Sequence, residues 1–355
     1  MLLRSIRYLS VTLIALVSSA SFAQTIPDLP EPVTSNSVAS VTLRGKTYIV
    51  SMLGLAPGKQ FSDMHNHVWM HTLGDFNWQQ LPAVPSKQNL NGRVAASATA
   101  LNNNFFIFGG YTVNADGSVQ TSEDSYRLDP VTKRYTKLND IPVPIGDNVA
   151  LTYQNRYIYL ASGWSDYGNV NLVQIFDNYT QRWSQATPLP GKGVFGLSGA
   201  MVDNKMLLCD GVTIDYFTDK PRQLRAEAAC YLGVVGNNAN SIDWRVIPHP
   251  TGKARFRMAA IATEVAGQKV IAFIGGSTTA HRYNGIGYNQ QPAEPSSEVW
   301  LYSIAEQKWL SAENSTAIMD LNSLVDINGS IYSVGGMQAE QQVSNKLIKH
   351  QIKLK

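Results

Sequence analysis

The sequence predicts an all-β protein, a six-bladed β-propeller with four antiparallel strands in most blades. Three observations predict it. A unit of about 50 residues recurs along the chain, each copy is built from short apolar or alternating runs, and runs with a helical period are absent after residue 23. Repeats of this length made of short strands are typical of propeller blades rather than of an ordinary β-sandwich.

Two markers divide the chain into its copies. A glycine doublet, sometimes degraded, closes the second strand of all six copies, at Leu53-Gly54, Gly109-Gly110, Ser162-Gly163, Asp210-Gly211, Gly275-Gly276 and Gly335-Gly336. An aromatic residue opens the fourth strand of five copies, at Trp78, Tyr135, Trp183, Trp244 and Trp309. Between these markers lies an alternating third strand, such as residues 298–302, and each of the first four copies ends in a proline-containing linker.

The sixth copy lacks the aromatic marker and the fourth strand that would follow it. The segment Ile26-Pro27-Asp28-Leu29-Pro30 resembles the linkers that end the other copies. We therefore expect the N-terminal segment to supply the missing strand and to close the ring. Closure by the two chain ends would leave few unpaired sheet edges.

The first 23 residues have the pattern of a cleaved secretory signal. Arg4 and Arg7 form a basic start, residues 9–17 are apolar, and Ser21-Phe22-Ala23 places small residues where a signal peptidase cleaves. The apolar run is too short to span a bilayer. The sequence thus predicts a signal peptide at 1–23, a propeller at 24–355 and a periplasmic location.

The net charge of the chain argues against two classes of binding partner. The chain carries a formal net charge of +3, and the two arginines of the signal account for most of it. Without clustered basic charge, neither nucleic acid nor an anionic membrane is expected as a partner.

Cys209 and Cys230 fall in one copy, on strands expected to be neighbours. An oxidising compartment allows a disulfide between them, and the alternative is two buried apolar thiols.

Long polar loops are expected to gather on one face of the ring. The connections between second and third strands are long at residues 55–66, 111–122, 212–224 and 277–297. Such loops at the mouth of a central channel are a natural ligand site. Four charged residues lie near the starts of inner strands at the same mouth: Arg93, Asp147, Arg257 and Asp320. The alternative for each is a solvated rim charge or a mutual ion pair.

The residue types in these loops suit a sugar acid. Tyrosine stacks on the apolar face of a pyranose, and arginine grips a carboxylate through two parallel hydrogen bonds. The predicted substrate-binding residues are Arg93, Arg225, Arg257, Arg282, Tyr283 and Tyr288. Asp215 and Glu227 are the candidate acid/base groups. No phosphate loop or dinucleotide fingerprint is present, so no cofactor is expected.

The doublets, spaced aromatics and six copies resemble the Kelch repeat over essentially the whole chain after residue 23. Four stretches look similar to exported bacterial Kelch propellers of the sialic acid mutarotase (N-acetylneuraminate epimerase) family: residues 27–32, 91–110, 236–244 and 277–297. The resemblance implies an exported enzyme that equilibrates the anomers of a reducing sugar acid. It also implies that Arg225, of the pair Leu224-Arg225, helps to hold the substrate.

The chain departs from that family at one decisive position. The family's catalytic glutamate directly follows the glycine of the fourth blade, and Val212 stands there in this sequence. Valine cannot take a proton, so the acid/base residue stays open among Asp210, Asp215, Asp219 and Glu227. Two functions are carried forward: a mutarotase or epimerase for sialic acid or a related sugar acid, and a non-catalytic propeller that binds a glycan or a protein through the loop face.

A metal site is the remaining alternative. Four side chains would lie on the same face of a strand because they are separated by even numbers of positions: Asp63, His65, His67 and His71. A His-x-His pair with a carboxylate nearby can bind zinc. His71, however, stands seven residues before Trp78, as Tyr302 does before Trp309, which favours a packed core role. The sequence therefore favours no metal. A copper oxidase site is rejected because both cysteines lie in one copy.

Overall fold

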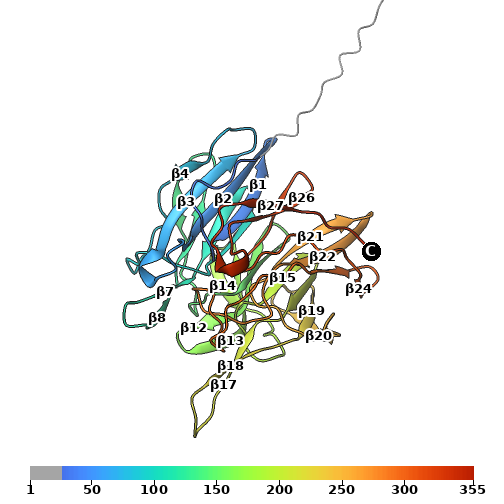
Figure 1. Cartoon of the computed structure of the whole chain (residues 1–355). Helices are drawn as coiled ribbons and strands as arrows, with labels where there is room; N and C mark the ends of the chain where they lie inside the picture. The colour runs from blue at the N-terminus through green and yellow to red at the C-terminus, as the bar shows by residue number, and fades with distance from the viewer. Residues whose placement is uncertain (1–25) are drawn as a thin grey trace, which may run out of the picture.

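The computed structural model describes residues 26–355, which form a six-bladed all-β propeller (Figure 1). The inner strands of successive blades lie side by side around the central channel, in the order β25, β1, β5, β11, β15 and β21. The prediction of fold class is confirmed. The predicted signal segment, residues 1–23, lies outside the described residues. No helix among residues 26–355 has the length and apolarity needed to cross a membrane.

Each of the first three blades has four strands in antiparallel order. The first comprises β1 (Ser37–Leu43), β2 (Lys46–Leu55), β3 (Met64–Thr72) and β4 (Gln79–Leu81). The second comprises β5 (Ser97–Leu101), β6 (Asn104–Phe108), β9 (Ser125–Leu128) and β10 (Tyr135–Lys137). The third comprises β11 (Val149–Tyr153), β12 (Tyr157–Ser165), β13 (Gly168–Asp177) and β14 (Arg182–Gln185).

The last three blades follow the same plan, except that the sixth has three strands. The fourth comprises β15 (Ser198–Val202), β16 (Lys205–Cys209), β19 (Cys230–Val235) and β20 (Ile242–Ile247). The fifth comprises β21 (Ala259–Val265), β22 (Gln268–Ile274), β23 (Val299–Ser303) and β24 (Lys308–Leu310). The sixth comprises β25 (Val325–Ile327), β26 (Ser330–Val334) and β27 (Leu347–His350).

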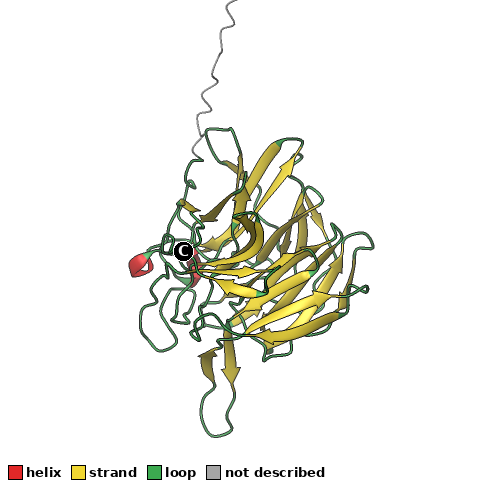
Figure 2. Ribbon diagram, turned by 90° about the vertical axis from the view of Figure 1, so that its right-hand side faces the viewer, coloured by secondary structure: helices red, strands yellow, loops and turns green. Residues whose placement is uncertain are grey.

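Two hairpins stand apart from the blades as separate two-stranded sheets. They are β7 (Tyr111–Val113) with β8 (Val119–Thr121), and β17 (Val212–Asp215) with β18 (Gln223–Ala226). Figure 2 shows the β17–β18 hairpin projecting beyond the strands of the blades. Two short 3₁₀ helices, η1 (Phe61–Asp63) and η2 (Ala339–Gln341), lie in connections. The hairpins occupy two of the four loops that the sequence marks as long.

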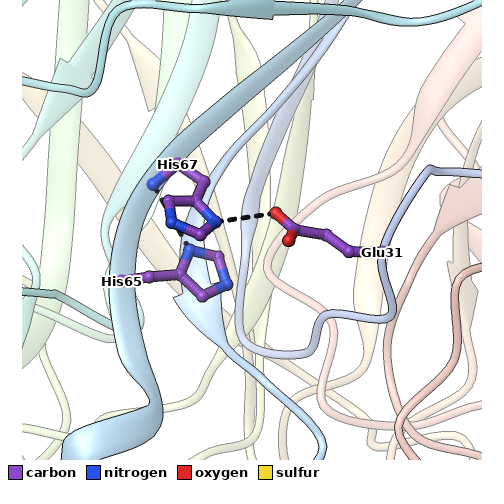
Figure 3. Close-up of side chains that lie close together, drawn as sticks. All are labelled: Glu31, His65 and His67. Carbon is purple, nitrogen blue, oxygen red and sulfur yellow. Dashed lines mark hydrogen bonds and ion pairs between the residues drawn. The ribbon is translucent and has the colours of Figure 1, made fainter.

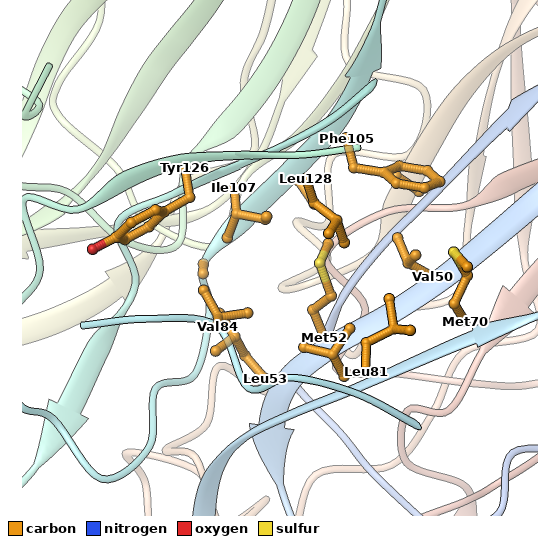
Figure 4. Close-up of a cluster of buried hydrophobic side chains, with 14 residues drawn as sticks. Val50, Met52, Leu53, Met70, Leu81, Val84, Phe105, Ile107, Tyr126 and Leu128 are labelled. Carbon is orange, nitrogen blue, oxygen red and sulfur yellow. The ribbon is translucent and has the colours of Figure 1, made fainter. Parts of the chain in front are cut away.

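The second strands are continuous apolar runs because both of their faces are covered by neighbouring blades. In β6, Phe105, Phe106, Ile107 and Phe108 are all buried. One face of β6 meets β2 and β3 of the first blade, in the cluster shown in Figure 4, where Ile107 and Phe105 lie near Met52 and Val50. The hydrophobic core is thus a set of layers between blades rather than one central mass.

The aromatic markers join each blade to the segment that precedes it. Each donates a side-chain hydrogen bond to a backbone carbonyl there: Trp78 to Pro27, Tyr135 to Pro82, Trp183 to Asn139, Trp244 to Thr187 and Trp309 to Pro248, over 2.7–3.1 Å. Trp78, Trp183 and Trp309 also pack on the ring seven residues earlier, with centroids 5.3, 5.2 and 5.1 Å from those of His71, Phe176 and Tyr302. His71 is therefore a buried core residue, as predicted.

The N-terminal segment runs beside the sixth blade. The amide of Leu29 donates to the carbonyl of Asn345 over 2.8 Å, and the amide of Val33 donates to Ser344 over 3.1 Å. Leu29 and Val33 are buried in a cluster that includes Trp78 and Val334. Residues 26–33 form no strand, so closure of the ring by a fourth strand stays a prediction.

The structure joins Cys209 and Cys230 as a disulfide. The two residues face each other directly on β16 and β19. Of the two alternatives left open by the sequence, the structure has the disulfide rather than two free thiols.

Removing this disulfide should lower the stability of the fourth blade. Replacing both cysteines with serine is expected to reduce the free energy of unfolding by about 3 kcal/mol, because the bond closes a short loop in the unfolded chain. Urea unfolding of the oxidised wild type and the double variant measures this difference. A variant as stable as the oxidised wild type would contradict the expectation.

Candidate functional site

The mouth of the channel is built from equivalent positions in all six blades. The residue after each glycine doublet forms a β-bridge with a residue just before an inner strand: Leu55 with Thr34, Tyr111 with Val94, Trp164 with Gly146, Val212 with Phe195, Ser277 with Phe256 and Met337 with Met319. The next residue on the inner side has a positive φ in every blade: Ser35, Ala95, Asp147, Gly196, Arg257 and Asp320. Non-glycine residues rarely adopt this conformation, so its recurrence marks a ring imposed by the fold.

Backbone hydrogen bonds run around this ring. The amides of Ala95, Asp147, Gly196 and Arg257 each donate to the carbonyl of the equivalent residue in the preceding blade, over 2.8–3.1 Å. The side chains that leave the ring are therefore held at defined positions around one opening.

A cavity of about 230 Å³ lies at this mouth. Its walls come from the second, third, fourth and fifth blades. They are formed by Tyr111, Val113, Gly117, Val119, Asp147, Trp164, Phe195, Arg222, Leu224, Arg282, Tyr283 and Tyr288. Aromatic rings, two guanidinium groups and one carboxylate thus face the same space. Three of the four long loops contribute, and the loop at residues 55–66 does not.

A buried charged cluster forms the floor. Arg257 donates to both carboxylate oxygens of Asp147, over 3.0 and 2.5 Å, and to Asp320 over 2.7 Å. Its Nη2 also donates to the Tyr111 hydroxyl over 3.0 Å, and Thr34 donates to the other oxygen of Asp320. The three charged side chains are at most 2% exposed. Arg257, a predicted substrate-binding residue, is thus at the site but beneath its surface.

Burial shifts the protonation of this cluster. Burial raises the pKa of Asp147, and the Arg257 guanidinium only partly opposes the shift. Burial works against ionisation of Arg257, but Asp147, Tyr111 and Asp320 outweigh it and raise the pKa of the guanidinium. Two carboxylates therefore share one permanent cation, and burial leaves Asp147, which lines the cavity, with a raised pKa despite that cation.

Two arginines in the wall have no acidic partner among the described residues. Arg222 lies 5.6 Å from the Trp164 ring and Arg282 lies 5.8 Å from the Tyr288 ring, and neither makes an ion pair within residues 26–355. Burial raises the pKa of Tyr288 to about 12, so its phenol keeps its proton at neutral pH and can donate a hydrogen bond. The predicted residues Arg282, Tyr283 and Tyr288 therefore do lie together in the cavity wall.

Arg93 lies away from the cavity. It is fully buried, and its Nη1 donates to the Gly109 carbonyl and to Ser122 Oγ, over 3.2 and 3.1 Å. Arg255 makes the same contact with Gly275 in the fifth blade, over 2.8 Å. Both arginines stand two residues before the ring position, where the side chain points into the blade and binds the glycine doublet.

Asp215, Arg225 and Glu227 meet one another but not the cavity. Arg225 pairs with Asp215 and with Glu227, each over 2.9 Å, and Lys192 pairs with the other oxygen of Asp215. Side chains alternate along β18, so Leu224 in the cavity wall places Arg225 on the opposite face. The hydrogen bonds from Lys192 and Arg225 lower the pKa of Asp215, which makes it a weaker base.

Three aromatic residues of the wall were not predicted from the sequence: Tyr111, Trp164 and Phe195. The repeat carries the signal for two of them, because Tyr111 and Trp164 directly follow the glycine doublets. Val212 holds the same position in the fourth blade, where it is buried against Phe195 and Phe256. Among the described residues, Asp147 is the only carboxylate that lines the cavity.

Metal-binding side chains gather in two other places. Glu31, His65 and His67 lie together on the first blade (Figure 3), and Asp210, Cys230 and His249 lie together near the fourth. Cys230 is in a disulfide, so it has no thiolate to offer. Asp63, the carboxylate expected beside the histidines, instead accepts the amide of Gln60 over 2.9 Å.

Known proteins share this fold and part of this sequence. No family model matches the chain. N-acetylneuraminate epimerase of Salmonella enteritidis PT4 is 21% identical over 235 residues, which is 55% of this chain and 56% of that protein. The match to Kelch-like protein 15 of Gallus gallus is 27% identical over 115 residues, 32% of this chain and 23% of that protein.

The chain is a distant relative of N-acetylneuraminate epimerases. The epimerase of Salmonella arizonae is 22% identical over 237 residues and is also matched over 56% of its length. The chain thus matches little more than half of these epimerases. A solved structure described as "Structure of YjhT" superposes with a TM-score of 0.68 at 18% identity, over 92% of this chain and 96% of that one. That likeness establishes the six-bladed fold.

Proposed function

We propose that the protein is an exported, mutarotase-like propeller that binds sialic acid or a related sugar acid in the cavity and interconverts its anomers. One observation carries the proposal. Arg222 and Arg282, which have no acidic partner among the described residues, face a cavity with aromatic walls above a basic carboxylate, Asp147. The distant similarity to proteins named N-acetylneuraminate epimerase supports this choice of substrate class.

The cavity offers separate groups for the carboxylate and for the sugar ring of such a ligand. A guanidinium binds a carboxylate through charge-assisted hydrogen bonds, and aromatic faces pack on the apolar side of a sugar ring. Arg222 and Arg282 approach from the fourth and fifth blades, and Trp164 and Tyr283 add ring faces. In sialic acid the carboxylate is attached to the anomeric carbon, so a molecule held in this way would keep its anomeric carbon beside the two guanidinium groups, in the cavity that Asp147 also lines.

Asp147 is the group that the geometry favours for proton transfer. It would take the proton of the anomeric hydroxyl as the bond between the anomeric carbon and the ring oxygen breaks. A water or the Tyr288 phenol would give a proton to the ring oxygen, and closure on the other face reverses these steps. The bidentate contact with Arg257 fixes the orientation of the carboxylate. Asp215 and Glu227 stay sequence-based candidates for the same role.

The test follows a single anomer of N-acetylneuraminate by proton NMR after dissolution, with and without the full protein. We expect the minor and major anomers to reach equilibrium faster with micromolar protein than without it. A decay rate equal to that of buffer alone would refute the proposed activity. Titration of the same sugar acid and its methyl ester, which lacks the negative charge, separates binding at the arginines from turnover.

Export and ring closure belong to the same proposal. A cleaved signal at residues 1–23 would deliver the protein to the periplasm. We infer that the N-terminal segment closes the ring, because Pro27 accepts the Trp78 indole as the linkers accept the aromatic residues of the second to fifth blades. N-terminal sequencing of the exported protein tests the cleavage site.

A binding function without catalysis is the second candidate. Tyr167, Tyr216 and Phe217 expose 93%, 64% and 40% of their surface, and the Tyr216 hydroxyl lies against Gly168. Tyr216 and Phe217 lie on the projecting β17–β18 hairpin and Tyr167 at the turn between β12 and β13, and exposed aromatic residues are suited to a glycan or a protein partner. This function predicts that the wild type leaves the anomerisation rate equal to that of buffer, and that a Tyr167→Ser/Tyr216→Ser variant loses binding to a glycan array. Equal glycan binding by the variant would exclude these tyrosines as a glycan contact.

A further inference from the structure

Three metal-binding side chains from distant parts of the sequence meet on the first blade. His65 and His67 lie two apart on β3, so the alternation of the strand turns both to one face. Glu31 reaches that face from the N-terminal segment (Figure 3). One ligand atom from each residue lies within 4.8 Å of the other two. None of the three residues lines the cavity at the channel mouth.

The surroundings hold these groups in place. Trp69, the next residue on the same face of β3, donates its indole N–H to Glu31 Oε1 over 2.7 Å. His67 Nδ1 lies 2.8 Å from the same oxygen. A carboxylate oriented by a neighbouring donor is the arrangement that supports a metal ligand from outside. The second oxygen of Glu31 accepts no hydrogen bond within residues 26–355.

His65 has an unsatisfied ring nitrogen. Its Nδ1 accepts the backbone N–H of His67 over 3.3 Å, and its Nε2 is buried without a hydrogen-bond partner among the described residues. Buried polar atoms almost always have a partner, so an orphan imidazole nitrogen beside a histidine and a glutamate needs a reason. A bound cation supplies one.

We propose that Glu31, His65 and His67 bind a zinc ion. Two imidazoles and one carboxylate are a donor set that Zn²⁺ accepts, with water at the fourth position. Ligands of a tetrahedral zinc lie about 3.3 Å apart. The ligand atoms here lie within 4.8 Å of one another, and His67 Nδ1 is 2.8 Å from Glu31 Oε1, so small side-chain rotations would bring all three to one ion. Binding through His65 Nε2 moves the ring proton to Nδ1 and therefore breaks the long hydrogen bond, 3.3 Å, that Nδ1 accepts from the His67 amide. The half-exposed His67 provides the route of entry.

Zinc at this place would join two segments of the fold. Glu31 belongs to the N-terminal segment that lies against the sixth blade, whereas both histidines belong to the first blade. A bound ion therefore adds a link where the two ends of the propeller meet. This inference is independent of the proposed sugar-acid activity, because the two sites share no residue.

The first experiment is a calorimetric titration of Zn²⁺ into the full protein, freed of metal by chelation and carrying no affinity tag. The wild type should bind one ion, and Glu31→Gln and His67→Gln should each weaken the affinity at least about tenfold. Asp63→Asn is the matched control, because Asp63 is a neighbouring carboxylate outside the cluster, and it should bind as the wild type does. Absence of binding by the wild type, or equal binding by all four proteins, would overturn the proposal.

Thermal unfolding gives a second measurement, because a ligand that binds only the folded state raises Tm. Zn²⁺ should raise the Tm of the wild type and of Asp63→Asn, and should leave that of His67→Gln unchanged. His67 is nearly half exposed, so this variant should fold. An equal rise in Tm for His67→Gln would place any zinc elsewhere and refute the site.

Discussion

Replacing Arg257 with methionine is expected to lower the free energy of unfolding by about 3–5 kcal/mol, the cost of leaving a buried charge without its partner. The guanidinium is the only cation in contact with Asp147 and Asp320 among the described residues. Its loss places two carboxylates together in a buried space, so at least one must take up a proton. Urea unfolding at pH 7, followed by tryptophan fluorescence, measures the change.

Arg225→Met is the matched control. Arg225 also contacts two carboxylates, but its side chain is 48% exposed. Exposed ion pairs contribute about 0–1 kcal/mol, so this variant should unfold almost as the wild type does. Equal stability of the two variants would show that the cluster at the channel mouth does not hold the blades together.

Replacing Asp147 with asparagine should slow anomer interconversion by about 10²–10⁴-fold, the usual contribution of a positioned general base. The amide keeps the shape of the side chain but cannot take the anomeric proton. It also leaves Arg257 paired with Asp320, so the fold should persist, which circular dichroism and Tm would check. The rate is measured by the same NMR experiment on a single anomer.

The pH profile sharpens this prediction. Burial raises the pKa of Asp147, and a base acts only when deprotonated. The protein-dependent rate of the wild type should therefore rise as pH increases through that raised pKa and level off above it. Asp147→Asn should show no such rise. Asp215→Asn is the control, and a large loss of rate there with an active Asp147→Asn would return the role to the β17–β18 hairpin.

The repeat made the blades predictable, because each copy shows its strand boundaries in glycines and aromatics. Arg93 was wrongly placed at the channel mouth because it lies near the start of an inner strand. That residue aligns with Arg255, two positions before the ring, and both side chains bind the glycine doublets rather than a ligand. Comparing the copies position by position separates these arginines from Arg257. Proximity to the start of a strand does not separate them.

Arg225 and Glu31 show two further limits of sequence reasoning. Arg225 was chosen by resemblance, but the parity of β18 places Leu224 in the cavity and Arg225 behind it. Strand parity is readable from sequence once the hairpin is recognised. The proximity of Glu31 to His65 cannot be predicted from the sequence in this way. The 33 residues between them include β1, β2 and their turns, which determine where the N-terminal segment passes.

The hairpins β7–β8 and β17–β18 form sheets of their own, and their strands join the ring at the channel mouth through the bridges of Tyr111 with Val94 and of Val212 with Phe195. Beyond these bridges, each can melt and reform without breaking a strand pair of the propeller, as a local unit of low stability. We therefore expect the parts of the hairpins beyond these bridges to open separately from the ring beneath them. A ligand that orders the hairpins would have to offset the conformational entropy lost when their two short strand ladders form. The floor around Asp147 would keep its structure. New specificity could arise in the hairpins at little cost to the blades.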